Sequence, residues 1–293
     1  MTHSLARIFA ILALPLLAAC AGAAKQTAPE AAPVPGYEAV QDGEFFIKAV
    51  PAEYLYEGNR KTNVSYSGDE APGTVVVDTF ARKLYLVGEG GTATLYPIAV
   101  GREGLSFRGT GVVGRKAEWP SWQPTANMIR TRPDLYAAYA GGLPGGLENP
   151  LGARALYLYR GGRDTMFRIH GTADNASIGH ATSAGCIRLF NQDAIDLYNK
   201  VPSGTRVKVR SEAESVAMEG AQMLNAFGHM VPATPENVEQ KEKDLAAIAR
   251  QEAKDRDAAA KAEKKRLAFC ARRGIPDAEC APTETAVTVG TSG

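Results

Sequence analysis

The residues best suited to chemistry lie between positions 169 and 189. Cys186 follows the small residues Ser183, Ala184 and Gly185, and two histidines, His170 and His180, precede it in the same stretch. A thiol beside an imidazole can lose its proton to the ring and become a strong nucleophile near neutral pH. The glycine before the thiol allows the backbone to approach a ligand closely. This pattern is compatible with a nucleophilic cysteine that has one of the two histidines as its base.

The other cysteines have partners or fates of their own. Cys270 and Cys280 can pair with each other, and Cys20 lies at the end of an export signal. Cys186 is then left without a partner, which is unusual because oxidising compartments tend to pair thiols. The alternative is structural: free cysteines are often small buried hydrophobes, and His170 is then a core residue at the end of a strand. The residues alone leave both interpretations open.

Several segments together resemble the YkuD-type L,D-transpeptidase family, of the ErfK/YbiS/YcfS/YnhG kind. The likeness covers residues 73–210. The matching motifs are His170-Gly171-Thr172, Ser177-Ile178-Gly179, Ser183 with Gly185-Cys186-Ile187-Arg188, Asn149-Pro150-Leu151-Gly152 and the aromatic segment 119–124. The resemblance implies a mainly β fold, a β-sandwich or barrel with short helices.

The resemblance also implies a substrate and roles for single residues. Cys186 is expected to attack the bond between a diamino acid and the terminal D-Ala of a peptidoglycan stem tetrapeptide, leaving a thioester that an amine of another stem or of a protein resolves. His170 is the expected general base, and the carbonyl of Gly171 orients it. The N–H groups of Gly185 and Cys186 are the candidate donors of the oxyanion hole. The residues expected to contact substrate are Ser183, Thr172 and Arg188, with a structural ion pair as the alternative role of Arg188. No cofactor is implied, and the four histidines show no metal-ligand spacing with the cysteines.

One position departs from the family pattern. The residue before Gly185-Cys186 is usually histidine and here is Ala184, which affects substrate positioning rather than the nucleophile and its base. His180 is a candidate surrogate, but we expect it to face solvent. Trp119, Trp122 and Tyr136 are expected either to cover the cleft as a lid or to lie in the core.

Two other functions fit the same residues. Water in place of the amine would make the protein an L,D-carboxypeptidase. A lipid-anchored scaffold that binds peptidoglycan, with Cys186 inert, is the non-enzymatic alternative.

Short β-branched runs predict an antiparallel meander, and a long charged stretch predicts a C-terminal helix. Asn191 is the expected N-cap of an earlier helix over 192–200. Thr234, Pro235 and Glu236 form a helix start, and Gly274 an end, for a helix over 235–273. The strands are expected at 74–78, 84–87, 94–100, 155–159, 166–170 and 205–209.

The N-terminus indicates export. Arg7 precedes an apolar run from Ile8 to Ala19, which is shorter than the roughly 20 residues of a membrane span and typical of a signal peptide. Leu17-Ala18-Ala19-Cys20 resembles a lipobox, so we expect lipidation of Cys20 and attachment to a membrane facing the periplasm, with Ala21 favouring the outer membrane. An ordinary secretory signal that is removed together with Cys20 is the alternative.

The expected organisation is a signal at 1–20, a tether and loosely ordered lead-in at 21–72, a catalytic domain at 73–210, and a helical, partly disordered extension at 211–293. Lys and Arg number 33 and Asp and Glu number 32 in the 293 residues. This balance gives no reason to expect nucleic-acid binding.

Overall fold

A computed structural model of the chain describes residues 33–101, 108–182, 187–276 and 280. The predicted mainly β fold class is confirmed, because most of its strands join one mixed sheet of eleven. The signal, Cys20 and the tether up to residue 32 lie outside the described residues and remain predictions. In spatial order the sheet consists of β11 (Ala181–Thr182), β7 (Ala99–Gly101), β12 (Ile187–Arg188), β10 (Arg163–His170), β9 (Arg154–Arg160), β8 (Gly109–Glu118), β13 (Arg206–Val209), β4 (Val75–Asp78), β5 (Lys83–Val87), β6 (Thr92–Pro97) and β3 (Thr62–Ser65).

The predicted meander is confirmed in β4, β5 and β6, which pair antiparallel in chain order. The expected single strand at 94–100 is divided in two, however. Pro97 is the last residue of β6 that pairs with β5, and a proline has no N–H to extend a ladder. After it, β7 pairs with β12 and β11 instead. At this point the chain leaves the meander and enters the part of the sheet that contains β10, the strand that ends at His170.

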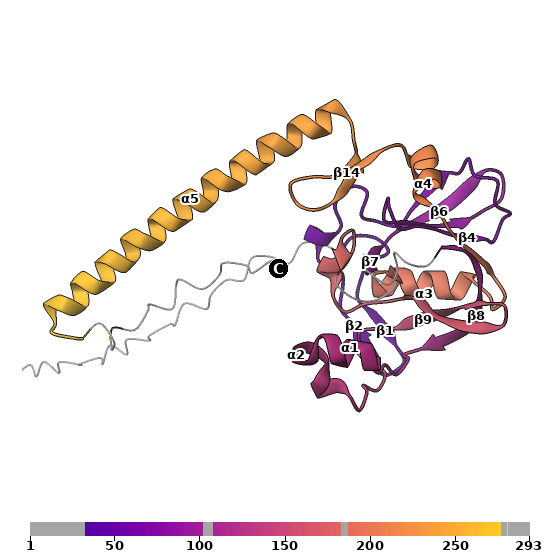
Figure 1. Ribbon diagram of the computed structural model, residues 1–293, viewed down its shortest axis with the longest axis horizontal. Helices are drawn as coiled ribbons and strands as arrows, with labels where there is room; N and C mark the ends of the chain where they lie inside the picture. Colours follow the sequence, from indigo (N-terminus) through magenta and orange to yellow (C-terminus); the bar gives the residue numbers. More distant parts are fainter. Residues whose placement is uncertain (1–32, 102–107, 183–186, 277–279, 281–293) are drawn as a thin grey trace, which may run out of the picture. The chain divides into compact units, whose positions relative to one another are not determined.

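The core fills the space between the sheet and α3 (Asn191–Lys200), which packs against β9 and β10 (Figure 1). Ala194 and Leu197 of the helix join buried aliphatic residues of the strands, such as Val77, Leu158 and Ile169. The helix was predicted correctly, but its N-cap is Phe190 and not Asn191. Asn191 lies one residue inside the helix, because its side chain is committed elsewhere: Oδ1 accepts a hydrogen bond from Ala153 N at 2.9 Å.

The lead-in from residue 37 to 72 is ordered, contrary to our expectation. It contains β1 (Val40–Asp42), β2 (Phe45–Ile47), the 3-10 turn η1 (Ala52–Tyr54) and β3. Tyr37 is buried against Phe190, and its hydroxyl lies 3.1 Å from a carboxylate oxygen of Asp193. Single apolar residues hold this segment in place by docking into the catalytic domain, and scattered anchors of this kind leave no periodic pattern in a sequence.

The C-terminal extension is more structured than expected in its first part. α4 (Glu212–Glu219) begins at a capping box formed by Ser211 and Glu214, and the hairpin of β14 (Gln222–Leu224) and β15 (Met230–Pro232) follows. The predicted long helix is confirmed as α5 (Pro235–Arg272), with Thr234 as its N-cap. Its end is closed by a disulfide between Cys270 and Cys280. Among the helices in the described ranges, none has the length and apolarity to cross a bilayer.

Candidate active site

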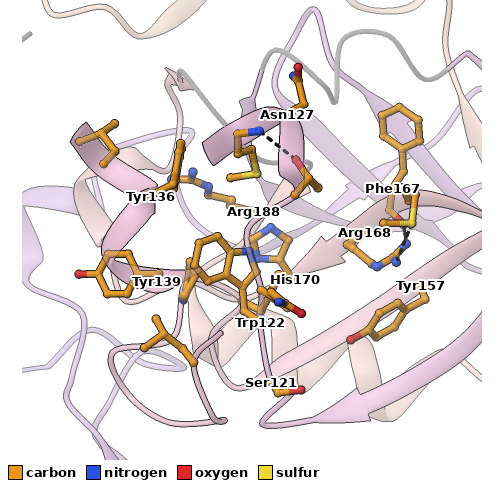
Figure 2. A pocket seen from close by; sticks show the side chains of 18 of the residues that line it. Ser121, Trp122, Asn127, Tyr136, Tyr139, Tyr157, Phe167, Arg168, His170 and Arg188 are labelled. Carbon is orange, nitrogen blue, oxygen red and sulfur yellow. Dashed lines mark hydrogen bonds between the residues drawn. The ribbon is translucent and has the colours of Figure 1, made fainter. Parts of the chain in front are cut away.

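A pocket of about 780 Å3 opens beside His170. One wall is formed by side chains of β8, β9 and β10. The facing residues come from segment 121–151, which contains α1 (Ala126–Thr131), α2 (Pro133–Tyr136) and the 3-10 turn η3 (Ala137–Tyr139). Figure 2 shows His170 and Arg188 among the aromatic and charged side chains that line this space.

His170 is the last residue of β10 and is 4% exposed. Its Nδ1 lies 2.7 Å from the carbonyl oxygen of Gly171. With the ring proton on Nδ1, that nitrogen donates to the carbonyl, and Nε2 keeps a lone pair that can accept a proton. The backbone contact thus selects the tautomer that a general base requires.

The electrostatic environment keeps this ring neutral. Burial lowers the pKa of His170 from its usual 6.5 to about 4, and the charges of Arg188 and Arg168 act in the same direction, against the opposing effect of the hydrogen bond to Gly171. At neutral pH the imidazole is therefore free to take a proton from a neighbouring acid.

The strand that follows the cysteine motif runs directly beside His170. β12 is parallel to β10, with Ile187 opposite Ile169 and Arg188 opposite His170. Leu189 N donates to the carbonyl of His170 at 2.8 Å. Cys186, Gly185, Ala184 and Ser183 lie outside the described residues. The strand register therefore fixes the position of Ile187, to which Cys186 is bonded, and not that of Cys186 itself.

Arg188 reaches the pocket and also has an acidic neighbour. It lines the cavity, and its Nη1 lies 3.9 Å from a carboxylate oxygen of Asp174. Thr172 differs from it: the side chain is buried, it is not among the lining residues, and its hydroxyl accepts a hydrogen bond from Asp174 N at 3.1 Å. The structure thus places Thr172 in the turn after β10 and not at the pocket surface.

The turn around His170 is closely packed around the amide of Asn191. A Cβ on Gly171 would lie 2.2 Å from Asn191 Oδ1, and one on Gly152 would lie 2.3 Å from the same atom. Gly152 also has a φ of +61°, which few other residues adopt readily. Asn191 therefore joins the segment 149–152 to the strand end that carries the base, a role that the sequence did not reveal.

Aromatic side chains form the wall contributed by segment 121–151. Trp122 lies 6.3 Å from the rings of both Tyr136 and Tyr139, and all three line the pocket. Trp122 and Tyr136 were expected either at the cleft or in the core, and the structure places them at the cleft. Trp119 does not line it: its Nε1 donates to Asp42 and its ring lies 4.2 Å from Phe45 of β2.

His180 does not face solvent as expected. It is half-buried in a T-shaped contact with His229 of the hairpin, 4.7 Å between ring centroids, and His229 stacks on Tyr56 at 4.1 Å. His180 is also absent from the pocket lining. Within the described ranges, no group of three His, Cys, Asp or Glu side chains is close enough to hold a metal ion.

Comparison with known proteins places this site in a family. Residues 72–209 match the model of the L,D-transpeptidase catalytic domain, YkuD. A Fuscovulum blasticum relative, named as an L,D-transpeptidase in the ATP synthase subunits region, is 39% identical over 46% of this chain and 68% of its own length. The chain belongs to the YkuD family of L,D-transpeptidase catalytic domains.

Two further relatives show how far the likeness extends. The Escherichia coli protein named probable L,D-transpeptidase ErfK/SrfK is 37% identical over 47% of this chain, but only 43% of its own length is covered. A solved structure from Brucella melitensis, named a probable carnitine operon oxidoreductase, is 45% identical, with 52% of this chain and 95% of that chain covered, at a TM-score of 0.38. That name describes a different activity, and at this TM-score the structure carries no weight for fold or function.

Proposed function

We propose that this protein is a peptidoglycan L,D-transpeptidase in which Cys186 is the nucleophile and His170 the general base. Family membership supports the class of reaction. The observation that carries the assignment of the base is the buried, neutral imidazole at the pocket, held in one tautomer by the carbonyl of Gly171. Cys186 is bonded to Ile187, whose strand pairs with that of His170.

The reaction has two halves. Nε2 of His170 takes the proton of the Cys186 thiol as sulfur attacks the carbonyl carbon of the diamino acid. The N–H of Gly185 donates to the resulting oxyanion. When the C–N bond breaks, the amine of D-Ala takes the proton from Nε2 and leaves, and a thioester remains.

The second half repeats these steps with a new amine. An amine of another stem, or of a protein, attacks the thioester and gives its proton to Nε2. Sulfur leaves as the thiolate and recovers a proton from the imidazolium. Arg188 at the pocket surface and Ser183 contact the substrate.

Mass spectrometry of the intact protein tests this proposal. The mature chain is incubated with a carbapenem and, separately, with a stem tetrapeptide. An acyl adduct is expected in the wild type and absent in Cys186→Ala. Release of D-Ala with an amine product distinguishes transfer from release with a hydrolysed product, and no adduct with either compound contradicts the assignment of Cys186.

We further propose that the protein is a lipoprotein of the periplasm, anchored through Cys20, with the outer membrane favoured. The lipobox-like segment supports lipidation, and the disulfide between Cys270 and Cys280 suits an oxidising compartment. Labelling with a fatty acid is expected to mark the wild type and to be lost in Cys20→Ala. A labelled variant would refute this anchor.

A further inference from the structure

Three side chains on neighbouring strands form a charged and aromatic cluster at the pocket. Arg115 of β8 and Arg168 of β10 are each paired in register with Tyr157 of β9. Their guanidinium carbons lie 3.5 Å and 4.2 Å from the centroid of the tyrosine ring. All three residues line the same pocket as His170, and Figure 2 shows Arg168 and Tyr157 to one side of that ring.

Irregularities in two strands occur at this cluster. The register of β8 shifts between Val113 and Arg115, and that of β10 shifts between Asp164 and Arg168. Met166, inside the second shift, has a φ of +65°, which is rare for a residue other than glycine. Bulges of this kind turn side chains in new directions and are common beside active sites. Two of them flanking one tyrosine indicate that the positions of the arginines are built into the sheet.

The charge of the cluster is only partly balanced. Asp164 binds Arg168 through two hydrogen bonds, of 2.7 and 2.8 Å. Arg115 is exposed; it lies on the ring of Tyr157 and at a greater distance from the charge of Asp164. Among the described residues, the pocket lining contains three arginines and one glutamate. One guanidinium is thus presented to a ligand on a flat aromatic support, an arrangement that suits bidentate binding of a carboxylate.

We propose that Arg115, supported by Tyr157 and Arg168, binds a carboxylate of the donor peptide that is retained in the thioester. This inference rests on the proposed transpeptidase function. Arg168 precedes His170 by two residues, so the two lie about 7 Å apart along β10. Arg115 is two strands further across the sheet, about 10 Å from Arg168.

Those distances decide which carboxylate is meant. The carboxylate of the leaving D-Ala is next to the carbonyl that sulfur attacks, which is too close to His170 to reach Arg115. Two carboxylates of a stem peptide are several bonds further away: the one on the side chain of the diamino acid and the α-carboxylate of the preceding γ-linked glutamate. Both offer the same chemistry to the cluster.

Matched peptides test the inference and separate the two sources. We would measure kcat/KM for D-Ala release from a tetrapeptide with both carboxylates free and from two peptides, each with one of them amidated. The wild type is expected to lose about 10-fold or more on one amidated peptide, the size of a charge-assisted hydrogen bond. Arg115→Gln should lose a similar factor, mainly in KM, on the free peptide and should discriminate less than about twofold between free and amidated forms.

Two matched variants serve as controls. Arg163→Gln removes an exposed arginine of the same strand as Arg168 that does not line the pocket, and it should behave as the wild type. Arg115→Lys keeps the charge without the planar group and should fall between the wild type and Arg115→Gln.

Three outcomes overturn the inference. Equal use of all three peptides by the wild type would exclude carboxylate recognition. Slower alkylation of Cys186 by iodoacetamide, which is uncharged, in Arg115→Gln would show that the residue acts through the nucleophile. Absence of D-Ala release from every peptide would refute the proposed function itself, and the inference with it.

Discussion

Two arginine–tyrosine clusters in the same sheet differ in how their charge is balanced. Arg210, the residue after β13, is 2% exposed and lies 5.1 Å from the ring of Tyr85. Its Nη1 is 3.2 Å from a carboxylate oxygen of Asp78 and 2.8 Å from one of Glu219. In the pocket cluster, by contrast, the carboxylate of Asp164 binds Arg168, and Arg115 is exposed beside the ring of Tyr157.

The difference separates a structural network from a binding surface. Around Arg210 the remaining polar atoms are also engaged: Ser215 donates to Asp78, and Lys83 and the hydroxyl of Tyr85 bind Glu219. A closed network of this kind joins α4 to the sheet and has no charge to offer a ligand. The pocket cluster lies in the cavity with His170 and is open on one side. Changes in the pocket should therefore affect activity, and changes around Arg210 should affect stability.

The largest expected effect is on activity. His170→Gln removes the general base and should lower kcat/KM for D-Ala release by about 10²–10⁴-fold. The circular dichroism spectrum should remain that of the wild type, because the change is confined to one side chain at the end of β10. A variant with full activity would break the assignment of the pocket as the chemical site.

Arg210→Met should show the opposite behaviour. Removing the arginine leaves the fully buried carboxylate of Asp78 without its cation, although Glu219 keeps Lys83, and this costs about 3–5 kcal/mol of unfolding free energy. Denaturation in urea measures this loss. Acylation of Cys186 by a carbapenem, measured below the unfolding transition, should be unchanged. A variant that keeps the stability of the wild type but loses acylation would contradict the comparison, in which Arg210 serves stability and the pocket serves activity.

The pH dependence of stability should be more sensitive to His170 than to His229. Burial lowers both pKa values below 6.5, so the unfolded chain binds the proton more readily than the folded chain. Stability should then fall as the pH decreases from 6.5, for His170 down to about 4. His170→Gln should flatten this fall in urea midpoints measured across that range, and His229→Phe should flatten it less, because His229 is less buried.

The smallest effect on activity is expected from the disulfide. Reducing Cys270–Cys280 opens a short loop at the end of α5 and should destabilise that end by roughly 2–3 kcal/mol. Hydrogen exchange of the last helical turns should increase, while D-Ala release stays within twofold. Loss of activity on mild reduction would show that the helix end contributes to the site.

The parts of the fold that were predictable depend on local patterns. The valine run of β4, the capped start of α5 and the family motifs around His170 all leave a signal within a few residues. β8 was missed because its glycines interrupt the alternation of side chains expected of a strand. The docking of Tyr37 was missed because it depends on partners far along the chain. The hairpin at 222–232 was missed because each of its strands has only three residues, too few to show an alternating pattern.

The site was predictable only in part for the same reason. His170 and Arg188 could be placed from a motif, and the structure brings them together in one pocket. The role of Asn191 depends on contacts with two glycines from separate segments. The cluster around Tyr157 depends on the register of three strands and on two bulges, which a sequence does not display.

The pairing of Cys186 with His170 is tested most directly by the rate of acylation of Cys186 as a function of pH. Intact-protein mass spectrometry with a carbapenem, from pH 4.5 to pH 9, gives this rate for the wild type and for His170→Gln. The wild type should remain reactive below pH 6.5, because the pKa of His170 is lowered by burial. The variant should react only as the pH approaches about 8.5, the ordinary pKa of a thiol. The same profile in both proteins would contradict the pairing.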